Sequence, residues 1–415
     1  MGDRKRLYPT DRAVRFLVYV VFTVFVRYYR IRKVMPLEVR NLKSPYLLLS
    51  NHVGHWDPFI IGHLLPRFTH FVSSDAAFKT PVTGFFLPRL GTIPIQKNVR
   101  DTRAVRAIAG VIRQGENVGL FPEAVRTWAG TTLPIDPSIG KLIKLLKVPV
   151  IVSVSRGMNL FNPRWSKKVR RTSLEIEYRL LLEPAQIKTM EPAAIHQAIA
   201  EALQHDEVGY QRAHRHTIHS QHRAEHINHT LFVCPSCHRI DTFICKRNDF
   251  WCTACAYSLH IDEHGFFKHK EGGQLYFDNI RDWYDWQISQ LADYVRRHLT
   301  SQNENPLFED KQSYIYSDAT GKSLQKVGRG DIRLYLDRIE MHLTGRDQPI
   351  ILRLEEILTI NPQVHEKLEI GYTGINYRCI GGRPGVSGLK WEVAVNVLWK
   401  EMGQWQKLSP YLEIK

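Results

Sequence analysis

Residues 46–58 read Tyr-Leu-Leu-Leu-Ser-Asn-His-Val-Gly-His-Trp-Asp-Pro, an apolar run followed by a short polar turn. Residues 46–50 suit a buried strand, whereas Asp57 followed by Pro58 is typical of a helix start, with the aspartate as N-cap and the proline at the first helical position. Gly54 permits a tight turn between the two elements. The stretch therefore predicts a strand, a turn and a helix in succession, as in an α/β domain.

The same turn predicts a pair of interacting side chains. Within one helix a spacing of five would place His52 and Asp57 on different faces, but across a turn the two can meet. A carboxylate bonded to one imidazole nitrogen fixes the tautomer and raises the basicity of the other nitrogen, which can then deprotonate a hydroxyl. Spacing alone does not exclude His55, and a helix cap beside a core histidine explains the same residues.

Short apolar runs alternate with helix-like segments from residue 46 to residue 183. This rhythm predicts a mixed sheet with flanking helices. The expected strands are 46–50, 69–72, 92–95, 117–121, 149–154 and 174–182.

Four sequence blocks resemble the glycerolipid acyltransferases, whose members convert lysophosphatidic acid to phosphatidic acid. The blocks occur in the family's order: Asn51-His52 with Asp57; Gly91-Thr92-Ile93-Pro94-Ile95-Gln96-Lys97; Phe121-Pro122-Glu123-Ala124-Val125-Arg126-Thr127; and Pro149 within the apolar run 148–152. The resemblance implies that His52 is the general base, that Asp57 orients it, and that the acceptor is bound by Gly91, Lys97, Glu123 and Arg126.

The implied reaction moves an acyl chain from acyl-CoA or an acyl carrier protein to the hydroxyl of a lysophospholipid. Cations such as Lys97 and Arg126 suit a phosphate, and Glu123 can accept a hydrogen bond from a glycerol hydroxyl. The chain departs from the family where Lys97 replaces Arg, where Ala124 and Val125 replace Gly and Thr, and at Pro94. Lysophosphatidic acid is the first expected acceptor, and a catalytically silent binding protein with the same fold is the alternative.

Cysteine spacing predicts a metal site further along the chain. Cys234 and Cys237 form one C-x2-C pair and Cys252 and Cys255 form another, the pattern of a four-cysteine zinc ribbon. Disulfides are the alternative in an oxidising compartment. Six histidines between 214 and 229 raise the question of a second metal site, although a solvated helix explains them equally well: His214, His216, His219, His222, His226 and His229.

Charge and hydropathy indicate that the chain binds an anionic surface. Lys and Arg total 57 against 41 Asp and Glu, a formal net charge of +16. Residues 16–26 are apolar, too short to span a bilayer, and flanked by basic residues, which favours a segment that lies in the cytoplasmic leaflet of a bacterial inner (plasma) membrane. Mixed charge around the cysteines argues against nucleic acid as a partner.

The expected organisation has six parts. They are a membrane-associating segment (1–40), the acyltransferase domain (41–190), a helical linker (191–230), the zinc ribbon (231–262), a helical connector (263–305) and a β domain closed by a helix, of pleckstrin-homology (PH) type (306–415). Strand and turn signals followed by an apolar helical pattern at 389–402 predict the last part. A role of that domain in forming a homodimer or in docking to a membrane is a further hypothesis.

Overall fold

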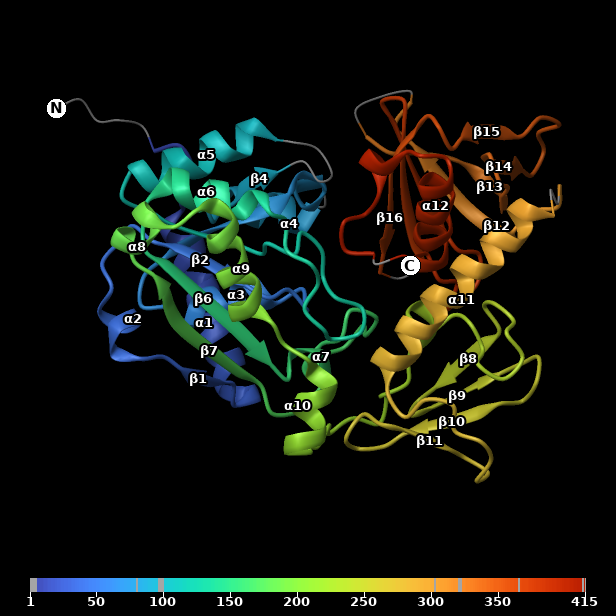
Figure 1. The fold of residues 1–415 in the computed structure, drawn as a ribbon, viewed down its shortest axis with the longest axis horizontal. Helices are drawn as coiled ribbons and strands as arrows, with labels where there is room; N and C mark the ends of the chain where they lie inside the picture. Colours follow the sequence, from blue (N-terminus) through green and yellow to red (C-terminus); the bar gives the residue numbers. More distant parts are fainter. Residues whose placement is uncertain are drawn as a thin grey trace. The chain divides into compact units, whose positions relative to one another are not determined.

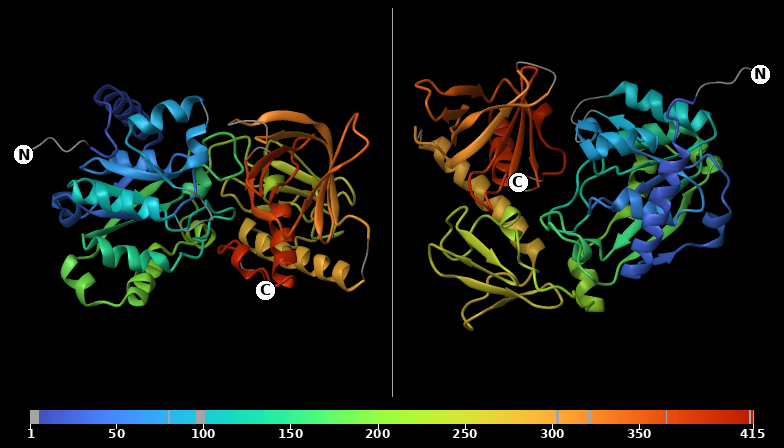
Figure 2. Two further views of the ribbon diagram at one scale, coloured as in Figure 1. Left: turned by 90° about the horizontal axis from the view of Figure 1, so that it is seen from above. Right: turned by 180° about the vertical axis from the view of Figure 1, so that it is seen from behind.

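The computed structural model describes residues 6–79, 81–95, 101–301, 304–319, 323–364, 366–412 and 414. It divides into two compact units, shown from three directions in Figures 1 and 2. Unit 1 contains Met1–Arg164 and Val169–His219, and unit 2 contains Trp165–Lys168 and Ser220–Lys415.

Unit 1 is built on a seven-stranded mixed sheet. Its strands, in spatial order, are β1 (Arg32–Val34), β7 (Glu175–Leu182), β6 (Val150–Arg156), β2 (Leu47–Ser50), β5 (Asn117–Leu120), β3 (Thr69–Ser74) and β4 (Ile93–Ile95). Within the described part of this sheet, every neighbouring pair is parallel except β6 and β7. The mixed sheet predicted from the sequence is confirmed, and β2, which leads into the His52 turn, is its central strand.

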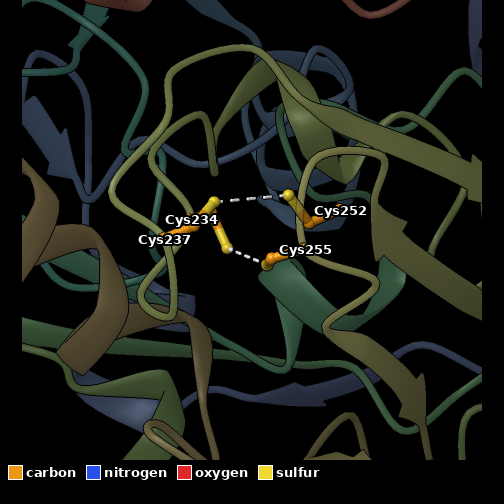
Figure 3. A group of neighbouring side chains, drawn as sticks. All are labelled: Cys234, Cys237, Cys252 and Cys255. Atoms are coloured by element: carbon orange, nitrogen blue, oxygen red, sulfur yellow. Dashed lines mark hydrogen bonds between the residues drawn. The ribbon is translucent and has the colours of Figure 1, made fainter.

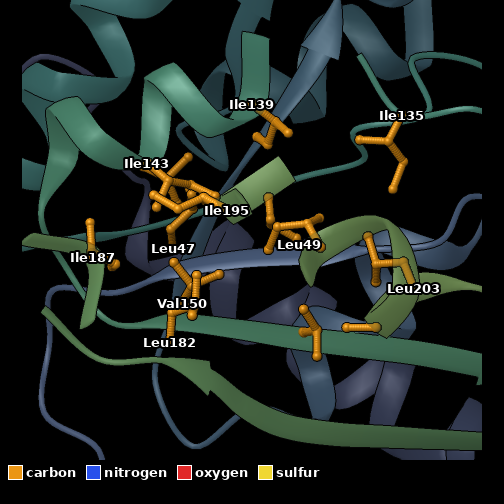
Figure 4. Packing of buried hydrophobic residues seen from close by; sticks show 14 of the residues in the cluster. Leu47, Leu49, Ile135, Ile139, Ile143, Val150, Leu182, Ile187, Ile195 and Leu203 are labelled. Atoms are coloured by element: carbon orange, nitrogen blue, oxygen red, sulfur yellow. The ribbon is translucent and has the colours of Figure 1, made fainter. Parts of the chain in front are cut away.

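Alternating side chains of the central strands divide the core between the two faces of the sheet. Leu47 and Leu49 face one helical layer and Leu48 faces the other, as the two-residue period of a strand requires. The first layer contains α5 (Thr102–Arg113), α6 (Ser138–Leu146), α8 (Pro184–Thr189) and α9 (Pro192–Leu203). Figure 4 shows part of this cluster, with Ile139, Ile143 and Ile195 packed over the strands.

The opposite face is covered by helices from the beginning of the chain. They are α1 (Arg12–Tyr29), α2 (Leu37–Asn41) and α3 (Asp57–Leu64). The short α7 (Met158–Phe161), from later in the chain, packs in the same layer. Phe22 of α1 is buried and stacks on Phe59 of α3 at a ring separation of 5.2 Å. Two further elements, η1 (Asp75–Lys79) and α4 (Pro81–Arg89), lie between β3 and β4 in the chain.

Helix α1 leaves a large apolar surface uncovered. Seven of its apolar or aromatic residues are exposed: Phe16, Leu17, Tyr19, Val20, Val21, Val24 and Tyr28. None of the helices in the described residues is both long and apolar enough to cross a lipid bilayer.

The expected helical linker differs from the structure in two ways. Its first helix, α9, is part of the core of unit 1, because Ile195, Ile199 and Leu203 are completely buried there. The second helix, α10 (Glu207–His214), ends where Arg215 adopts a left-handed backbone with a φ of 48°. The expected helix therefore does not continue through the histidine-rich residues 215–226, which contain turns and bends.

Unit 2 begins with a four-stranded antiparallel ribbon that is closed by a long helix. The strands are β8 (Phe243–Lys246), β9 (Asp249–Cys252), β10 (Ser258–Ile261) and β11 (Phe267–His269), and the expected connector forms α11 (Ile280–Thr300). Trp283 of α11 is completely buried in the ribbon core, and its indole Nε1 donates to the carbonyl of Val233 at 3.0 Å. The aromatic helix is thus part of the ribbon's own core.

The C-terminal part is a seven-stranded antiparallel sheet closed by a helix, as the sequence predicted. The strands, in spatial order, are β15 (Ile350–Arg353), β14 (Arg338–Leu343), β13 (Gln325–Leu334), β12 (Phe308–Ser317), β18 (Ile375–Ile380), β17 (Lys367–Tyr372) and β16 (Ile357–Gln363). Helix α12 (Leu389–Glu401) packs against β16 and α11. β16 tolerates Pro362 because it is an edge strand.

Buried charges join the ribbon to the β domain inside unit 2. Lys390 of α12 is almost completely buried and forms ion pairs with Asp241 of the ribbon and Asp310 of β12. Asp310 also accepts a hydrogen bond from the Trp391 indole at 2.7 Å. These two carboxylates compensate the buried ammonium group, which would be costly without partners.

Candidate active site

The centre of the site is the Asp57 carboxylate, which is completely buried. The backbone N–H groups of Val53 and Gly54 donate to its Oδ2 at 2.7 and 2.9 Å. The expected N-cap role is corrected here: Trp56 occupies the N-cap position, and Asp57 is the first helical residue. Its side chain closes the preceding turn because the free amides of that turn lie within reach.

His52 lies against this carboxylate. Its Nδ1 is 2.9 Å from Asp57 Oδ2, and its ring stacks on Phe121 with centroids 4.1 Å apart. The side chain is 20% exposed, so it can reach a substrate, whereas Asp57 cannot. His55 is exposed and comes from the same turn, but the 2.9 Å contact assigns the carboxylate to His52.

Glu123 holds the next loop beside His52. One carboxylate oxygen accepts from the His52 backbone N–H at 2.8 Å, and the other accepts from the Leu133 N–H at 2.7 Å. Burial raises the pKa of Glu123 to about 8, against the effect of these two amide donors and with a contribution from the Asp57 charge. The structure therefore gives Glu123 a positioning role, and its expected bond to an acceptor hydroxyl stays a prediction.

The sheet topology explains why these residues meet. β2 and β5 are parallel neighbours, with Leu49 opposite Leu120, so the loops after both strands leave the same edge of the sheet. His52 follows β2 and Glu123 follows β5. Ligands of open α/β sheets bind at this carboxyl edge.

Arg126 is a cation with no partner in its own loop. Among the described residues, its guanidinium forms no hydrogen bond or ion pair. Burial lowers its pKa to about 9, and the nearby Arg164 adds to this effect, whereas Asp57 opposes it. Arg164 donates to the Arg126 carbonyl at 2.6 Å and stacks over the Trp128 ring at 3.7 Å, which holds the loop. A half-buried, uncompensated arginine is suited to an anionic ligand.

Ala124 keeps the backbone that glycine would adopt. Its φ is 60°, in the left-handed region, although the residue carries a Cβ. The Val125 N–H bonds the Glu123 carbonyl at 2.7 Å across this residue. The residue that departs from the family pattern in this loop therefore adopts a backbone that glycine favours, at a conformational cost of roughly 1 kcal/mol.

Gly91, another expected acceptor residue, lies in the turn before β4. Gly91 has a φ of 64° and its carbonyl accepts from His70 Nδ1 at 2.8 Å; a Cβ there would lie 2.6 Å from the same nitrogen. Its glycine is thus required by the turn before β4. Lys97 lies outside the described residues.

Two positioning residues were not predicted. Asn51 Oδ1 accepts from the Ser155 N–H at 2.8 Å and so ties the end of β2 to β6. The buried Glu207 accepts from the N–H groups of Gly157 and Asn159 at 2.9 and 3.2 Å, and thereby holds the loop after β6. Asn51 stood in the quoted motif, but its partner lies 104 residues away.

The four cysteines of unit 2 converge on one point (Figure 3). Their Sγ atoms all lie within 4.8 Å of one another, and the pairs Cys234–Cys255 and Cys237–Cys252 are each 3.7 Å apart. This is too long for a disulfide. Tetrahedral zinc with Zn–S bonds of about 2.3 Å requires S···S separations of about 3.8 Å. The cluster therefore fits a zinc site.

Comparison with known proteins gives the family of the region that carries the His52–Asp57 pair. The family model described as Acyltransferase matches residues 30–155, so this part of the chain belongs to that family.

Two 1-acyl-sn-glycerol-3-phosphate acyltransferases are similar in sequence. The enzyme of Saccharomyces cerevisiae is 26% identical over 152 residues, which are 33% of this chain and 50% of that enzyme. The enzyme of Bacillus subtilis is 22% identical over 126 residues, which are 30% of this chain and 62% of that enzyme. The chain thus spans less than two thirds of each of these relatives.

Two solved structures are similar in part. The 1-acyl-sn-glycerophosphate (LPA) acyltransferase PlsC from Thermotoga maritima has a TM-score of 0.40 at 15% identity, covering 51% of this chain and 83% of that one. The N-terminal PH domain of human ARAP2 has a TM-score of 0.18 at 16% identity, covering 22% of this chain and 80% of that one.

The left-handed backbone at Ala124 predicts that Ala124→Gly stabilises unit 1 by up to about 1 kcal/mol, because glycine adopts this φ without strain and the exposed methyl group loses no packing. Ala193→Gly, at an exposed position near the start of α9, is the control and is expected to destabilise by a similar amount. Thermal unfolding of the full chain measures both. A lower melting temperature for Ala124→Gly would contradict the strain at this loop.

Proposed function

We propose that unit 1 transfers an acyl chain from an acyl thioester, acyl-CoA or acyl carrier protein, to the hydroxyl of a lysophospholipid, with lysophosphatidic acid as the first acceptor. The observation that carries the proposal is the 2.9 Å contact between His52 Nδ1 and the buried Asp57 carboxylate. Membership of the acyltransferase family supports the reaction class. The two similar glycerolipid acyltransferases support the acceptor class.

The reaction requires one base and no covalent enzyme intermediate. Asp57 accepts a hydrogen bond from the Nδ1–H group of His52, so Nε2 carries the lone pair that removes the proton from the acceptor hydroxyl. The resulting oxygen attacks the thioester carbonyl. The tetrahedral intermediate then collapses, the C–S bond breaks, and the imidazolium returns its proton to the departing thiolate. An ester and a free thiol are formed.

Arg126 supports a phosphate-bearing acceptor. Its guanidinium has no protein anion as partner in the described residues, and it lies close enough to Asp57 to affect the electrostatics of the same site. A bidentate bond to a phosphate would satisfy it. This would place the glycerol hydroxyl of a lysophospholipid near His52.

The catalytic proposal predicts that His52→Ala lowers acyl transfer by about 10²- to 10⁴-fold or more, the range that a general base contributes. Asp57→Asn is expected to fall into the same range, because the amide no longer fixes the tautomer. His55→Ala, from the same turn, should retain most of the activity. Transfer of labelled acyl groups from acyl-CoA and acyl carrier protein to lysolipids measures all three. A folded wild type that acylates no lysolipid would favour the binding-protein alternative.

The phosphate proposal predicts a change in acceptor preference. Arg126→Gln is expected to lower kcat/KM for lysophosphatidic acid by roughly 10- to 100-fold, the equivalent of a charged hydrogen bond. The rate with monoacylglycerol, which has no phosphate, should change little. Arg103→Gln on the exposed face of α5 is the control. Equal losses with both acceptors would show that Arg126 does not bind the phosphate.

We propose that α1 attaches unit 1 to the cytoplasmic face of an anionic bacterial membrane. The seven exposed apolar or aromatic residues of α1 support this, together with basic residues at both ends of the helix: Arg12, Arg15, Arg27 and Arg30. Such helices bind at the interface through buried apolar area and attraction to anionic lipid.

This docking predicts that the double variant Phe16→Ser and Val20→Ser binds vesicles of phosphatidylglycerol and phosphatidylcholine much less than the wild type. Both side chains are exposed, at 70% and 42%, so the fold should tolerate the change. Leu145→Ser, which alters an exposed leucine of α6, is the control. Vesicle cosedimentation measures binding, and unchanged binding by the double variant would contradict the role of α1.

We propose that the four-cysteine cluster binds a structural Zn²⁺. All four positions around the ion would be occupied by thiolates, so it would stabilise the ribbon and take no part in acyl transfer. Cys252→Ala is expected to lose one equivalent of zinc per chain and to destabilise unit 2, as measured by plasma mass spectrometry and thermal unfolding. An unchanged zinc content would exclude the four cysteines as the ligands of this ion.

A further inference from the structure

A second group of metal-ligand side chains lies within unit 2, away from the cysteines. His226 and His229 come from the end of the histidine-rich segment, and Glu366 comes from the turn between β16 and β17. One ligand atom of each lies within 4.8 Å of the other two. Two imidazoles and one carboxylate form a common ligand set for zinc, with a fourth position left for water.

Hydrogen bonds hold His229 and Glu366 in place. Glu366 Oε1 lies 2.8 Å from His229 Nε2 and also accepts from the Gly385 N–H at 3.1 Å. The His229 carbonyl accepts a hydrogen bond from the Ser387 hydroxyl at 2.7 Å. His226 and His229 stack with ring centroids 5.6 Å apart. The three side chains are therefore held together by contacts from the ribbon side and from the β domain.

Two independent features point to a ligand. His229 is 3% exposed, and its Nδ1 has no hydrogen-bond partner among the described residues. A buried polar atom without a partner is costly, and native structures retain few of them. In addition, His226 and Glu366 both adopt left-handed backbone, with φ of 69° and 60°. Such strain in residues other than glycine gathers at ligand sites.

We propose that His226, His229 and Glu366 bind a second divalent transition-metal ion, Zn²⁺, which fastens the end of the histidine-rich segment to the β16–β17 turn. Unlike the cysteine cluster, this site has nitrogen and oxygen ligands and no thiolate. Residues far apart in the sequence form it, so it exists only when both parts of unit 2 are folded.

The test is the metal stoichiometry of the full chain after saturation with ZnSO₄ and removal of excess ion. Plasma mass spectrometry is expected to find two Zn²⁺ per chain in the wild type and one in both His226→Asn and Glu366→Gln. Asparagine suits the left-handed backbone at residue 226. His222→Ala is the matched control, since His222 precedes the site and pairs with Glu225 at 2.6 Å; it should retain two.

Titration of the metal-free wild type with Co²⁺ tests the proposal without any variant. Charge-transfer absorption from thiolates is expected to saturate at one equivalent, whereas d–d absorption should continue to rise until two. A wild type that binds one ion only, or variants that both retain two, would overturn the proposal and leave His229 and Glu366 as an ion pair.

Discussion

The buried Asp57 carboxylate is the interaction on which the candidate active site depends. A charge in a dry interior is tolerated only when several donors compensate it, and each hydrogen bond to a charged group contributes about 1.5–3 kcal/mol. Two of these donors are the backbone amides of Val53 and Gly54, and the third is the His52 ring. One carboxylate thus sets the conformation of the turn and the orientation of the histidine together.

The sheet extends this arrangement to the rest of the site. Parallel pairing of β2 with β5 and with β6 brings three loops to one edge, where Glu123 and Asn51 fasten them to each other by bonds to backbone amides. The half-buried Arg126 then remains as the cation without a protein partner in the described residues. Glu123 and Asn51, whose carboxylate and amide oxygens accept hydrogen bonds from backbone amides, hold the loops in place. The Arg126 guanidinium is available to bind the acceptor.

The sequence predicted much of this because local signals were strong. Apolar runs of strand length, the turn before Asp57 and the paired cysteines each lie within a few residues, so the mixed sheet, the His52–Asp57 contact and the cysteine cluster could be expected. The left-handed Ala124 could not, because its side chain disfavours the conformation that the surrounding bonds impose. Nor could the burial of α9, which depends on packing against α6 and β6.

Partners that are distant in the sequence carry no local signal. Six histidines suggested a helical face, but α10 ends at His214, and the partner of His229 is Glu366, 137 residues later. The loop contact between Arg164 and Arg126 is of the same kind, since it joins residues 38 apart. Such groups become visible only when the tertiary structure is known.

The most direct test of the account is the protonation of the His52 ring, observed by ¹⁵N NMR of histidine-labelled protein and assigned with a His52→Gln variant. If Asp57 orients the base, the neutral ring carries its proton on Nδ1 and has an unprotonated Nε2, and Asp57→Asn disturbs this tautomer. A neutral His52 with its proton on Nε2 in the wild type would contradict the central claim, because that nitrogen could not then accept the hydroxyl proton.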